Sequence, residues 1–164
     1  MDSNSKVVIL MGSPSDQSHV DLIIAQLNQF EIRTEVRVAS AHKTPGKLLK
    51  IIQEYQNSLE WLVLITVAGR SNALSGMVDA NVSWPVIACP PPSDAFGGAD
   101  IFSSLRMPSG VCPMLVLDPA NAALAAAKIL GLGDTVIKGR VQELQQTNAA
   151  KLDSADLLVN KLNG

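Results

Sequence analysis

The residues best suited to chemistry in this chain stand together in one stretch, Ser40-Ala41-His42-Lys43-Thr44-Pro45. This stretch supplies a hydroxyl, a titratable imidazole and a fixed cation. A run typical of a buried strand (34–38) precedes it and an amphipathic pattern follows it, with Thr44 suited to cap a helix and Pro45 to its first position. Because an imidazole changes charge near neutral pH, His42 is the first candidate for acid–base catalysis. The competing interpretation is a surface or capping histidine.

Two more polar turns follow apolar runs, Gly12-Ser13-Pro14-Ser15-Asp16 and Gly69-Arg70-Ser71-Asn72. The first offers two hydroxyls and a helix N-terminus, whose free N–H groups favour an anion such as phosphate, and Ser40 and Lys43 would add to that pocket. Asp16 would repel phosphate but suits ribose hydroxyls. Serine-rich turns often only cap helices, and neither turn matches a P-loop or a dinucleotide fingerprint. Three such turns beside an imidazole nevertheless favour a ligand site.

The elements that must position these turns are strands alternating with helices. Apolar runs predict five strands, at 6–11, 33–38, 61–67, 85–89 and 114–117. Apolar residues at helical spacing predict helices around Val20–Phe30, Leu48–Tyr55, Leu74–Val78 and Ala120–Leu130. This alternation indicates an α/β fold, a three-layer α/β/α doubly wound parallel sheet, in which ligands bind at the carboxyl ends of the strands.

The rest of the chain predicts a loop, a helical turn and a tail. Residues 93–98 read as a loop over the crevice and residues 101–105 as a helical turn. Residues 136–163 contain no strand and predict one or two helices. We therefore expect a single domain over 1–164, whose tail helix from about residue 134 packs on its own subunit or on a neighbouring one.

Composition and charge disfavour several classes of protein. A net charge of −2 argues against nucleic-acid or anionic-membrane partners. The apolar runs are strand-sized and the N-terminus is polar, which predicts no membrane span, no signal peptide and a cytoplasmic location. Two distant histidines and no clustered carboxylates predict no metal site. Cys89 and Cys112 lie in or beside strand-like runs and are predicted to be buried, reduced thiols.

Four segments, MGSPSD, SAHKTP, AGRSNALSGM and SSLRMPSG, resemble the PurE family of purine biosynthesis, and the resemblance extends roughly from Val7 to Leu130. The family's bacterial mutases have arginine after the histidine and a second histidine in a GGAAHLPG turn. Lys43 and Ala73 stand at those positions here. The sequence is therefore more similar to class II, the phosphoribosylaminoimidazole carboxylases, in the stand-alone form found in some bacteria. This resemblance implies a flavodoxin-like fold and a homo-octamer.

The resemblance also implies an activity and roles for individual residues. The reaction would be the reversible carboxylation of 5-aminoimidazole ribonucleotide by CO₂, without ATP, biotin, metal or other cofactor. His42 would move the proton, and Asp16 would hold the ribose. The phosphate would be held by Ser13, Ser15, Ser40 and Lys43. The ring and the CO₂ end would be lined, chiefly by backbone N–H groups, by Gly69, Ser71, Asn72 and Ala73.

Two competing functions and one uncertainty about roles stay open. The mutase shares the fold and His42, and only Lys43 and the AGRSN turn argue against it. A flavodoxin-like nucleotide-binding or signalling module would have no catalytic role. However, the strand ends lack the acidic cluster of a receiver domain, and aromatic residues, at 4%, are scarce for a flavin site. Arg70 and Arg106 could each lie at the site or at a subunit contact.

Overall fold

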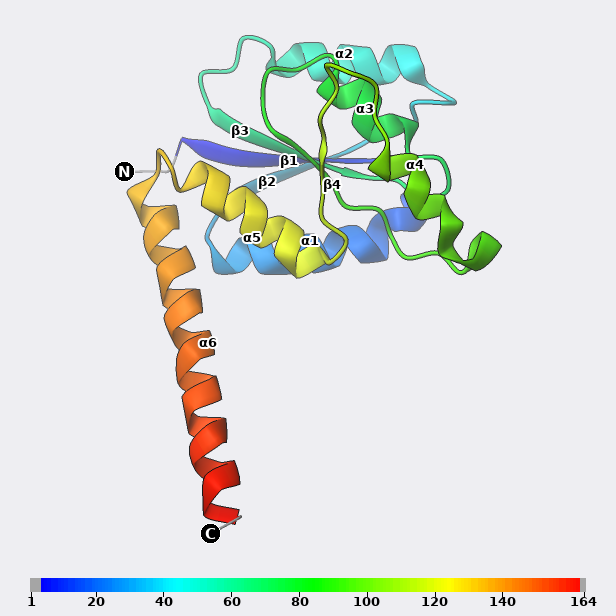
Figure 1. Cartoon of the computed structure of the whole chain (residues 1–164). Helices are drawn as coiled ribbons and strands as arrows, with labels where there is room; N and C mark the ends of the chain where they lie inside the picture. The colour runs from blue at the N-terminus through cyan, green and yellow to red at the C-terminus, as the bar shows by residue number, and fades with distance from the viewer. Residues whose placement is uncertain (1–3, 163–164) are drawn as a thin grey trace.

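A single parallel sheet organises the protein (Figure 1). The computed structural model describes residues 4–162. The five strands lie in the order β2-β1-β3-β4-β5, which is the flavodoxin-like order. They are β1 (Ser5–Met11), β2 (Arg33–Val38), β3 (Trp61–Val67), β4 (Val86–Ala88) and β5 (Met114–Leu115). The predicted α/β doubly wound sheet is confirmed, although β4 and β5 are shorter than the sequence predicted.

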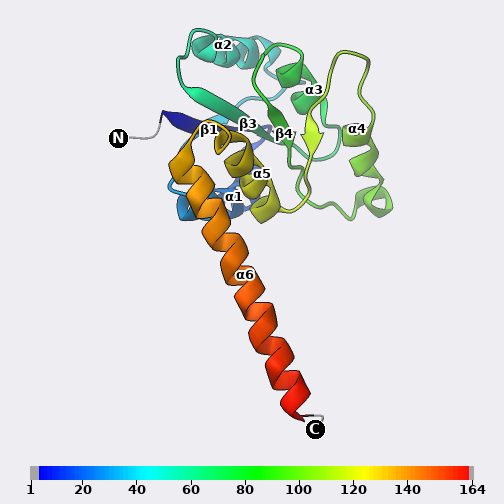
Figure 2. The same ribbon diagram turned by 60° about the vertical axis from the view of Figure 1, so that its left-hand side comes forward.

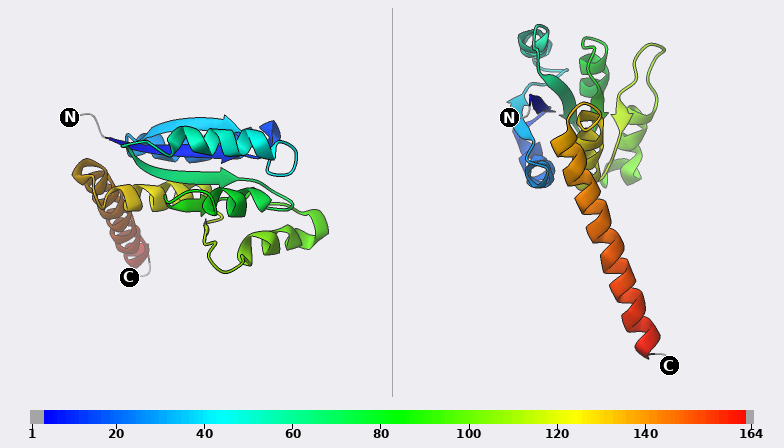
Figure 3. Two further views of the ribbon diagram at one scale, coloured as in Figure 1. Left: turned by 90° about the horizontal axis from the view of Figure 1, so that it is seen from above. Right: turned by 90° about the vertical axis from the view of Figure 1, so that its left-hand side faces the viewer.

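Helices connect the strands and cover both faces of the sheet (Figure 3). The principal helices are α1 (Gln17–Gln29), α2 (Pro45–Tyr55), α3 (Ala73–Asp79), α5 (Pro119–Leu130) and α6 (Thr135–Leu162). The short elements are the 3-10 helices η1 (Pro14–Asp16) and η2 (Ala95–Ile101) and the single turn α4 (Phe102–Leu105). All of the helices predicted from apolar spacing are present, and the tail is one helix.

The alternation of side chains along the strands divides the core into two layers. Val7, Ile9 and Met11 of β1 pack in the layer that contains α1 and α5. Val8 and Leu10 point the other way, into the layer that contains α2 and α3. Strand β2 lies at the edge of the sheet and is half-buried, so the prediction of a buried strand was wrong there. Because helices cover both faces of the sheet, its carboxyl edge is the part that the polar turns occupy.

Asp118 and Thr44 each stand at the N-cap position of a helix, but only Asp118 makes a capping hydrogen bond. Asp118 caps α5 as expected, since its carboxylate accepts a hydrogen bond from the Asn121 N–H at 2.8 Å. Thr44 stands at the N-cap position of α2 but makes no capping hydrogen bond. Its hydroxyl instead accepts from the Ser40 N–H at 3.0 Å, which ties the start of the helix to the end of β2.

Helix α6 leaves the body of the protein (Figure 2). Its first turns pack on α5 and bury Ile137 and Val141. Beyond them its apolar residues lie open to solvent, with exposed fractions above one half, namely Leu152, Leu157, Leu158 and Val159. The tail therefore buries only its beginning on its own subunit. None of the described helices is long and apolar enough to cross a membrane.

Candidate active site

A cavity of about 500 Å³ lies where β1, β2 and β3 end. Its wall is made by Gly12, Ser13, Ser15, Asp16, Ser40, Ala41, His42, Lys43, Ala68, Gly69, Arg70, Ser71 and Leu74. The three polar turns singled out in the sequence thus meet at one site. Every residue predicted for the site lines this cavity except Asn72 and Ala73. Arg70 also lines it, whereas Arg106 does not.

The turn after β1 presents hydroxyls, an acid and a helix start. The Gly12 N–H donates to the Val67 carbonyl at 2.9 Å and fixes the turn beside β3. The Ser13 hydroxyl oxygen accepts hydrogen bonds from the Ser15 N–H at 3.3 Å and the Ser15 hydroxyl at 2.8 Å. Asp16 lines the cavity just before α1, and its carboxylate makes no capping hydrogen bond to the helix. Burial raises the pKa of the Asp16 carboxyl above its usual value, against opposition from the Ser13 backbone and His19.

The turn after β2 holds its backbone rigidly and leaves two charged or titratable side chains free. The Ser40 hydroxyl oxygen accepts from the Lys43 N–H at 3.2 Å, and the Ser40 carbonyl accepts from the Thr44 N–H at 2.9 Å. The side chains of His42 and Lys43 are exposed and make no hydrogen bond or ion pair with any described residue. An imidazole and an ammonium group can therefore reach a ligand in the cavity without first breaking an interaction.

The turn after β3 is held in an uncommon backbone conformation. Arg70 has a φ of 59°, in the left-handed region that costs a residue with a side chain roughly 1–2 kcal/mol. The backbone N–H groups of Gly69, Arg70 and Ser71 donate no hydrogen bond within residues 4–162. These N–H groups provide candidate donors for a carboxylate or a carbonyl oxygen at this end of the cavity.

Asn72 does not line the cavity, as the sequence suggested it would. It is buried and holds neighbouring segments together through hydrogen bonds. It is 2% exposed, and its side-chain oxygen caps α3 by accepting from the Ser75 N–H at 3.2 Å. Its own N–H donates to the Ser103 hydroxyl at 2.9 Å, and its amide group donates to Ser104. Asn72 therefore has neither its backbone N–H nor its side chain free. Ala73 begins α3 and lies outside the cavity wall.

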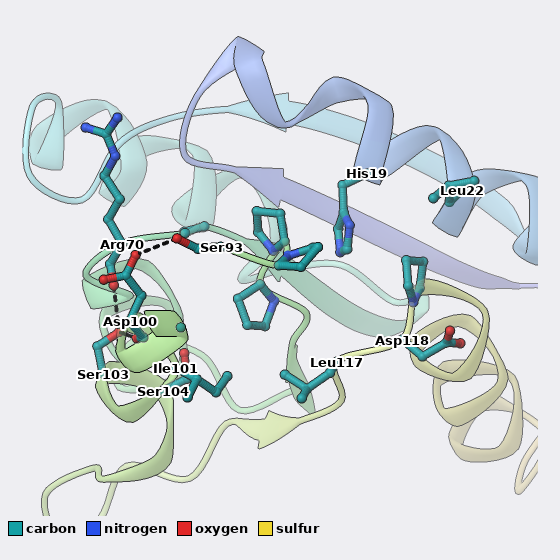
Figure 4. Close-up of a pocket in the computed structure, with 17 residues that line it drawn as sticks. His19, Leu22, Arg70, Ser93, Asp100, Ile101, Ser103, Ser104, Leu117 and Asp118 are labelled. Atoms are coloured by element: carbon teal, nitrogen blue, oxygen red, sulfur yellow. Dashed lines mark hydrogen bonds between the residues drawn. The ribbon is translucent and has the colours of Figure 1, made fainter. Parts of the chain in front are cut away.

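A second cavity of about 570 Å³ adjoins the first and shares Ala68, Gly69 and Arg70 with it (Figure 4). Three consecutive prolines, Pro90–Pro92, and Leu117 give it a mainly apolar wall. The sequence marked parts of this wall, namely the turn at Gly69 and Arg70 and the loop from Ser93, but it did not predict that these segments enclose a second cavity.

His19 lies on α1 as expected, yet it also borders the second cavity. Its Nε2 lies 3.4 Å from the Cys89 Sγ. Burial lowers the pKa of the His19 imidazole, although Cys89, Asp16 and Asp118 oppose the shift. Burial also raises the pKa of the Cys89 thiol to about 12. Both groups are therefore predominantly neutral at pH 7. Cys112, by contrast, is exposed, so the prediction of two buried thiols was wrong for it.

The fold and the cavity define a class of protein, a flavodoxin-like α/β scaffold with a polar cavity at the carboxyl edge of its sheet. The chain belongs to the AIR carboxylase family, whose model matches residues 6–151. The resemblance to the PurE family is thereby confirmed. Within the described residues, no three His, Cys, Asp or Glu side chains gather as metal ligands would.

Relatives and a solved structure support the same family. The chain is 57% identical over 151 residues to the phosphoribosylaminoimidazole carboxylase of Archaeoglobus fulgidus, covering 92% of this chain and 83% of that one. It is 51% identical over 150 residues to the enzyme of the same name from Treponema denticola, covering 92% and 94%. The crystal structure of Treponema denticola PurE superposes with a TM-score of 0.91 at 50% identity, covering 93% of this chain and 96% of that one.

Proposed function

We propose that this protein catalyses the carboxylation of 5-aminoimidazole ribonucleotide (AIR) by CO₂ in purine biosynthesis, and the reverse decarboxylation. The product is 4-carboxy-5-aminoimidazole ribonucleotide. Two relatives, at 57% and 51% identity, carry the name of this activity. The observation that carries the proposal is a single cavity that joins the imidazole of His42 to hydroxyls, an ammonium group and backbone N–H groups, and within residues 4–162 neither the imidazole nor these N–H groups have a hydrogen-bond partner.

The reaction requires the protein mainly to position the substrate and to transfer a proton. The exocyclic amine makes C4 of AIR an enamine-like carbon, which is already nucleophilic and needs no cofactor to activate it. Attack of C4 on CO₂ forms the new carbon–carbon bond and leaves a proton and a carboxylate on that carbon. The neutral imidazole of His42 removes the proton, and the released electron pair restores the aromatic ring. In reverse, the imidazolium protonates C4 and CO₂ departs.

The two ends of AIR have matching sides in the cavity. Its phosphate would lie against Lys43 and the hydroxyls of Ser13, Ser15 and Ser40, where ammonium and hydroxyl groups supply donors. Its ribose hydroxyls would donate to Asp16. Its ring and the new carboxylate would face Gly69 and Ser71, whose N–H groups have no partner in the described chain. His42 lines the same cavity and would reach C4 of the ring for proton transfer.

The test is an assay that separates CO₂, bicarbonate and N-carboxylated substrate. AIR mixed with CO₂ should give an initial burst of product, and AIR mixed with bicarbonate a lag, because only CO₂ has a sufficiently electrophilic carbon. Carbonic anhydrase should remove the difference between the two. The competing mutase function would appear as consumption of N5-carboxyaminoimidazole ribonucleotide faster than its spontaneous decarboxylation. A protein that gives no product from AIR under any of these conditions would contradict the proposal.

We further infer a homo-octamer in the cytoplasm. The support for assembly is helix α6, whose outer turns leave Leu152, Leu157 and Leu158 exposed. Apolar side chains arranged along a helix that extends away from its own core need a covering surface. A second copy of this chain supplies one, in keeping with the expectation that the tail packs on a neighbouring subunit.

A further inference from the structure

The turn that closes the ring side of the cavity depends on a neighbouring segment. Residues 69–71 lie between β3 and α3, and Arg70 adopts the left-handed conformation without the freedom of a glycine. A residue with a side chain keeps such a backbone only where the surroundings hold it there. The contacts that hold it come from α4, some thirty residues further along the chain.

The hydroxyl of Ser103 bridges both sides of this turn. It donates toward the Arg70 carbonyl at 3.1 Å (Figure 4) and accepts from the Asn72 N–H at 2.9 Å. It also lies 2.8 Å from the Asp100 carbonyl, so its single proton is shared between two carbonyl oxygens. The bridged groups flank Ser71. One side chain thus fixes the peptide on either side of a residue that lines the cavity.

A buried network holds the base of the same turn. The Asn72 amide donates to the Ser104 hydroxyl at 2.8 Å, and the Ser75 hydroxyl donates to the Asn72 side-chain oxygen at 2.7 Å. The Thr66 and Ser75 hydroxyl oxygens lie 2.7 Å apart. Asn72, Ser75, Ser104 and Thr66 are all nearly inaccessible to solvent, so these bonds are not exchanged for water. Consequently, Asn72 is held rigidly. Ser103, which is hydrogen-bonded to Asn72, can therefore fix the conformation of residues 69–71.

We propose that Ser103 is a positioning residue of the active site, whose hydroxyl keeps Arg70 in its left-handed conformation and so fixes the turn Gly69–Ser71, which presents N–H groups without a partner in residues 4–162 to the ring and CO₂ end of the substrate. This inference rests on the proposed carboxylase function for its kinetic consequence. Ser103 itself does not line the substrate cavity. Its effect therefore passes through the turn, and phosphate-side binding stays independent of it.

The first experiment is the variant Ser103→Ala, compared with Ser103→Thr and with Ser93→Ala. Ser93 is a matched control, because its hydroxyl also bonds in the second cavity, to Asp100, but makes no hydrogen bond to residues 69–72. Ser103→Ala should lower kcat/KM for CO₂ by about tenfold or more, since small misplacements at a reacting centre are costly. The dissociation constant for AIR should change less than twofold. Ser103→Thr, which keeps the hydroxyl, and Ser93→Ala should match the parent within about twofold in both measurements. A Ser103→Ala enzyme with unchanged kcat/KM, or with equal losses in AIR binding, overturns the proposal.

A double-mutant cycle separates this role from a general structural one. Glycine adopts the left-handed region freely, so in an Arg70→Gly background the turn no longer needs the hydrogen bonds of Ser103. Ser103→Ala should then cost less than about twofold relative to Arg70→Gly alone. An undiminished loss in that background would mean that Ser103 acts in some other way. If Ser103→Ala does not fold, Ser103→Cys takes its place, with a weaker donor and a loss expected in the same direction.

A substrate-free measurement distinguishes failure of this inference from failure of the proposed function. The backbone N–H of Asn72 is hydrogen-bonded to Ser103, and the exchange of this hydrogen with deuterium should accelerate at least about tenfold in Ser103→Ala but not in Ser93→Ala. Unchanged exchange would refute the positioning role of Ser103 even in an active enzyme. Accelerated exchange in a protein that carboxylates no AIR would support the positioning role of Ser103 and reject the carboxylase function.

Discussion

His42 and Lys43 are neighbours in sequence, yet they would serve opposite ends of one ligand. Both side chains extend from a backbone fixed by Ser40, and neither is engaged elsewhere in the described chain. A side chain without partners pays no cost of breaking an interaction when substrate arrives. The two residues can therefore be tested separately, one by the rate of proton transfer and the other by affinity for phosphate.

Replacing His42 by asparagine should abolish turnover while nucleotide binding persists. His42→Asn keeps a side chain of similar shape but removes the proton acceptor. General acid–base catalysis is typically worth 10²–10⁴-fold, so kcat for carboxylation and decarboxylation should fall to about 1% or less. Calorimetry should still detect AIR binding. A variant that retains more than about a tenth of the parent kcat would show that another group moves the proton.

Replacing Lys43 by alanine should weaken binding of the phosphorylated substrate selectively. A charge-assisted hydrogen bond is worth about 1.5–3 kcal/mol, which is about ten- to a hundredfold in affinity. Lys43→Ala should therefore raise the dissociation constant of AIR by that factor and leave the dephosphorylated nucleoside nearly unaffected. Equal losses for the two ligands would place the ammonium group at the CO₂ end instead.

Residue types and their position at strand ends predicted most of the cavity wall, because polar turns after parallel strands converge at one edge. They could not predict the place of Asn72. Only the fold reveals that Ser103 and Ser104, about thirty residues later, bond to it. The second cavity was not predicted for a related reason, since its wall is assembled from segments that lie far apart in the sequence.

At the scale of elements, the apolar patterns specified strands and helices well where both faces were buried. Strand β2 was the exception, because an edge strand with alternating polar residues is only half covered. The short strands β4 and β5 were overestimated, since an apolar run does not reveal where pairing with a neighbour stops. The sequence placed the junction between α5 and α6 correctly, with one helix ending at Leu130 and the tail beginning near residue 134, but it did not reveal that a glycine allows the close contact there.

Gly131 allows the last turn of α5 to approach the start of α6. A Cβ atom there would lie 3.0 Å from the Ala127 carbonyl and 3.3 Å from the backbone of Lys138, neither of which can move without shifting a helix. Gly131→Ala should therefore destabilise the protein by about 1–3 kcal/mol. Gly139→Ala is the matched control in α6, because a Cβ there meets nothing within 4 Å. Relief of glycine's entropy cost should make it stabilising by about 0.5–1 kcal/mol.

Thermal unfolding of both variants gives the answer in the signs of the two shifts. Gly131→Ala should lower the midpoint and Gly139→Ala should raise it or leave it unchanged. An upward shift for both variants would indicate that helix propensity, and not the contact between α5 and α6, decides stability at this junction.

At the scale of the molecule, α6 is the part of the structure that a single chain does not explain. Its first turns belong to the core, through Ile137 and Val141, whereas Leu152, Leu157 and Leu158 of its outer turns are exposed. An isolated helix in water draws little stability from its sequence alone, and most of the stability of a protein helix comes from packing of its apolar face. Assembly would therefore stabilise α6 as well as join the subunits.

Charge placed on the outer turns of α6 should dissolve the assembly and leave the subunit folded. The double variant Leu157→Lys and Leu158→Lys removes two side chains that are 62% and 63% exposed in the single chain, so loss of the subunit's own packing is not expected. Burying either ammonium group in a subunit interface would be strongly unfavourable. The control Gln145→Lys with Gln146→Lys adds the same charge to exposed polar positions nearer the body. Light scattering should give a smaller mass for the leucine variant than for the control, and circular dichroism should report a folded sheet in both. Equal masses would mean that these leucines lie outside any interface and that another surface holds the subunits together.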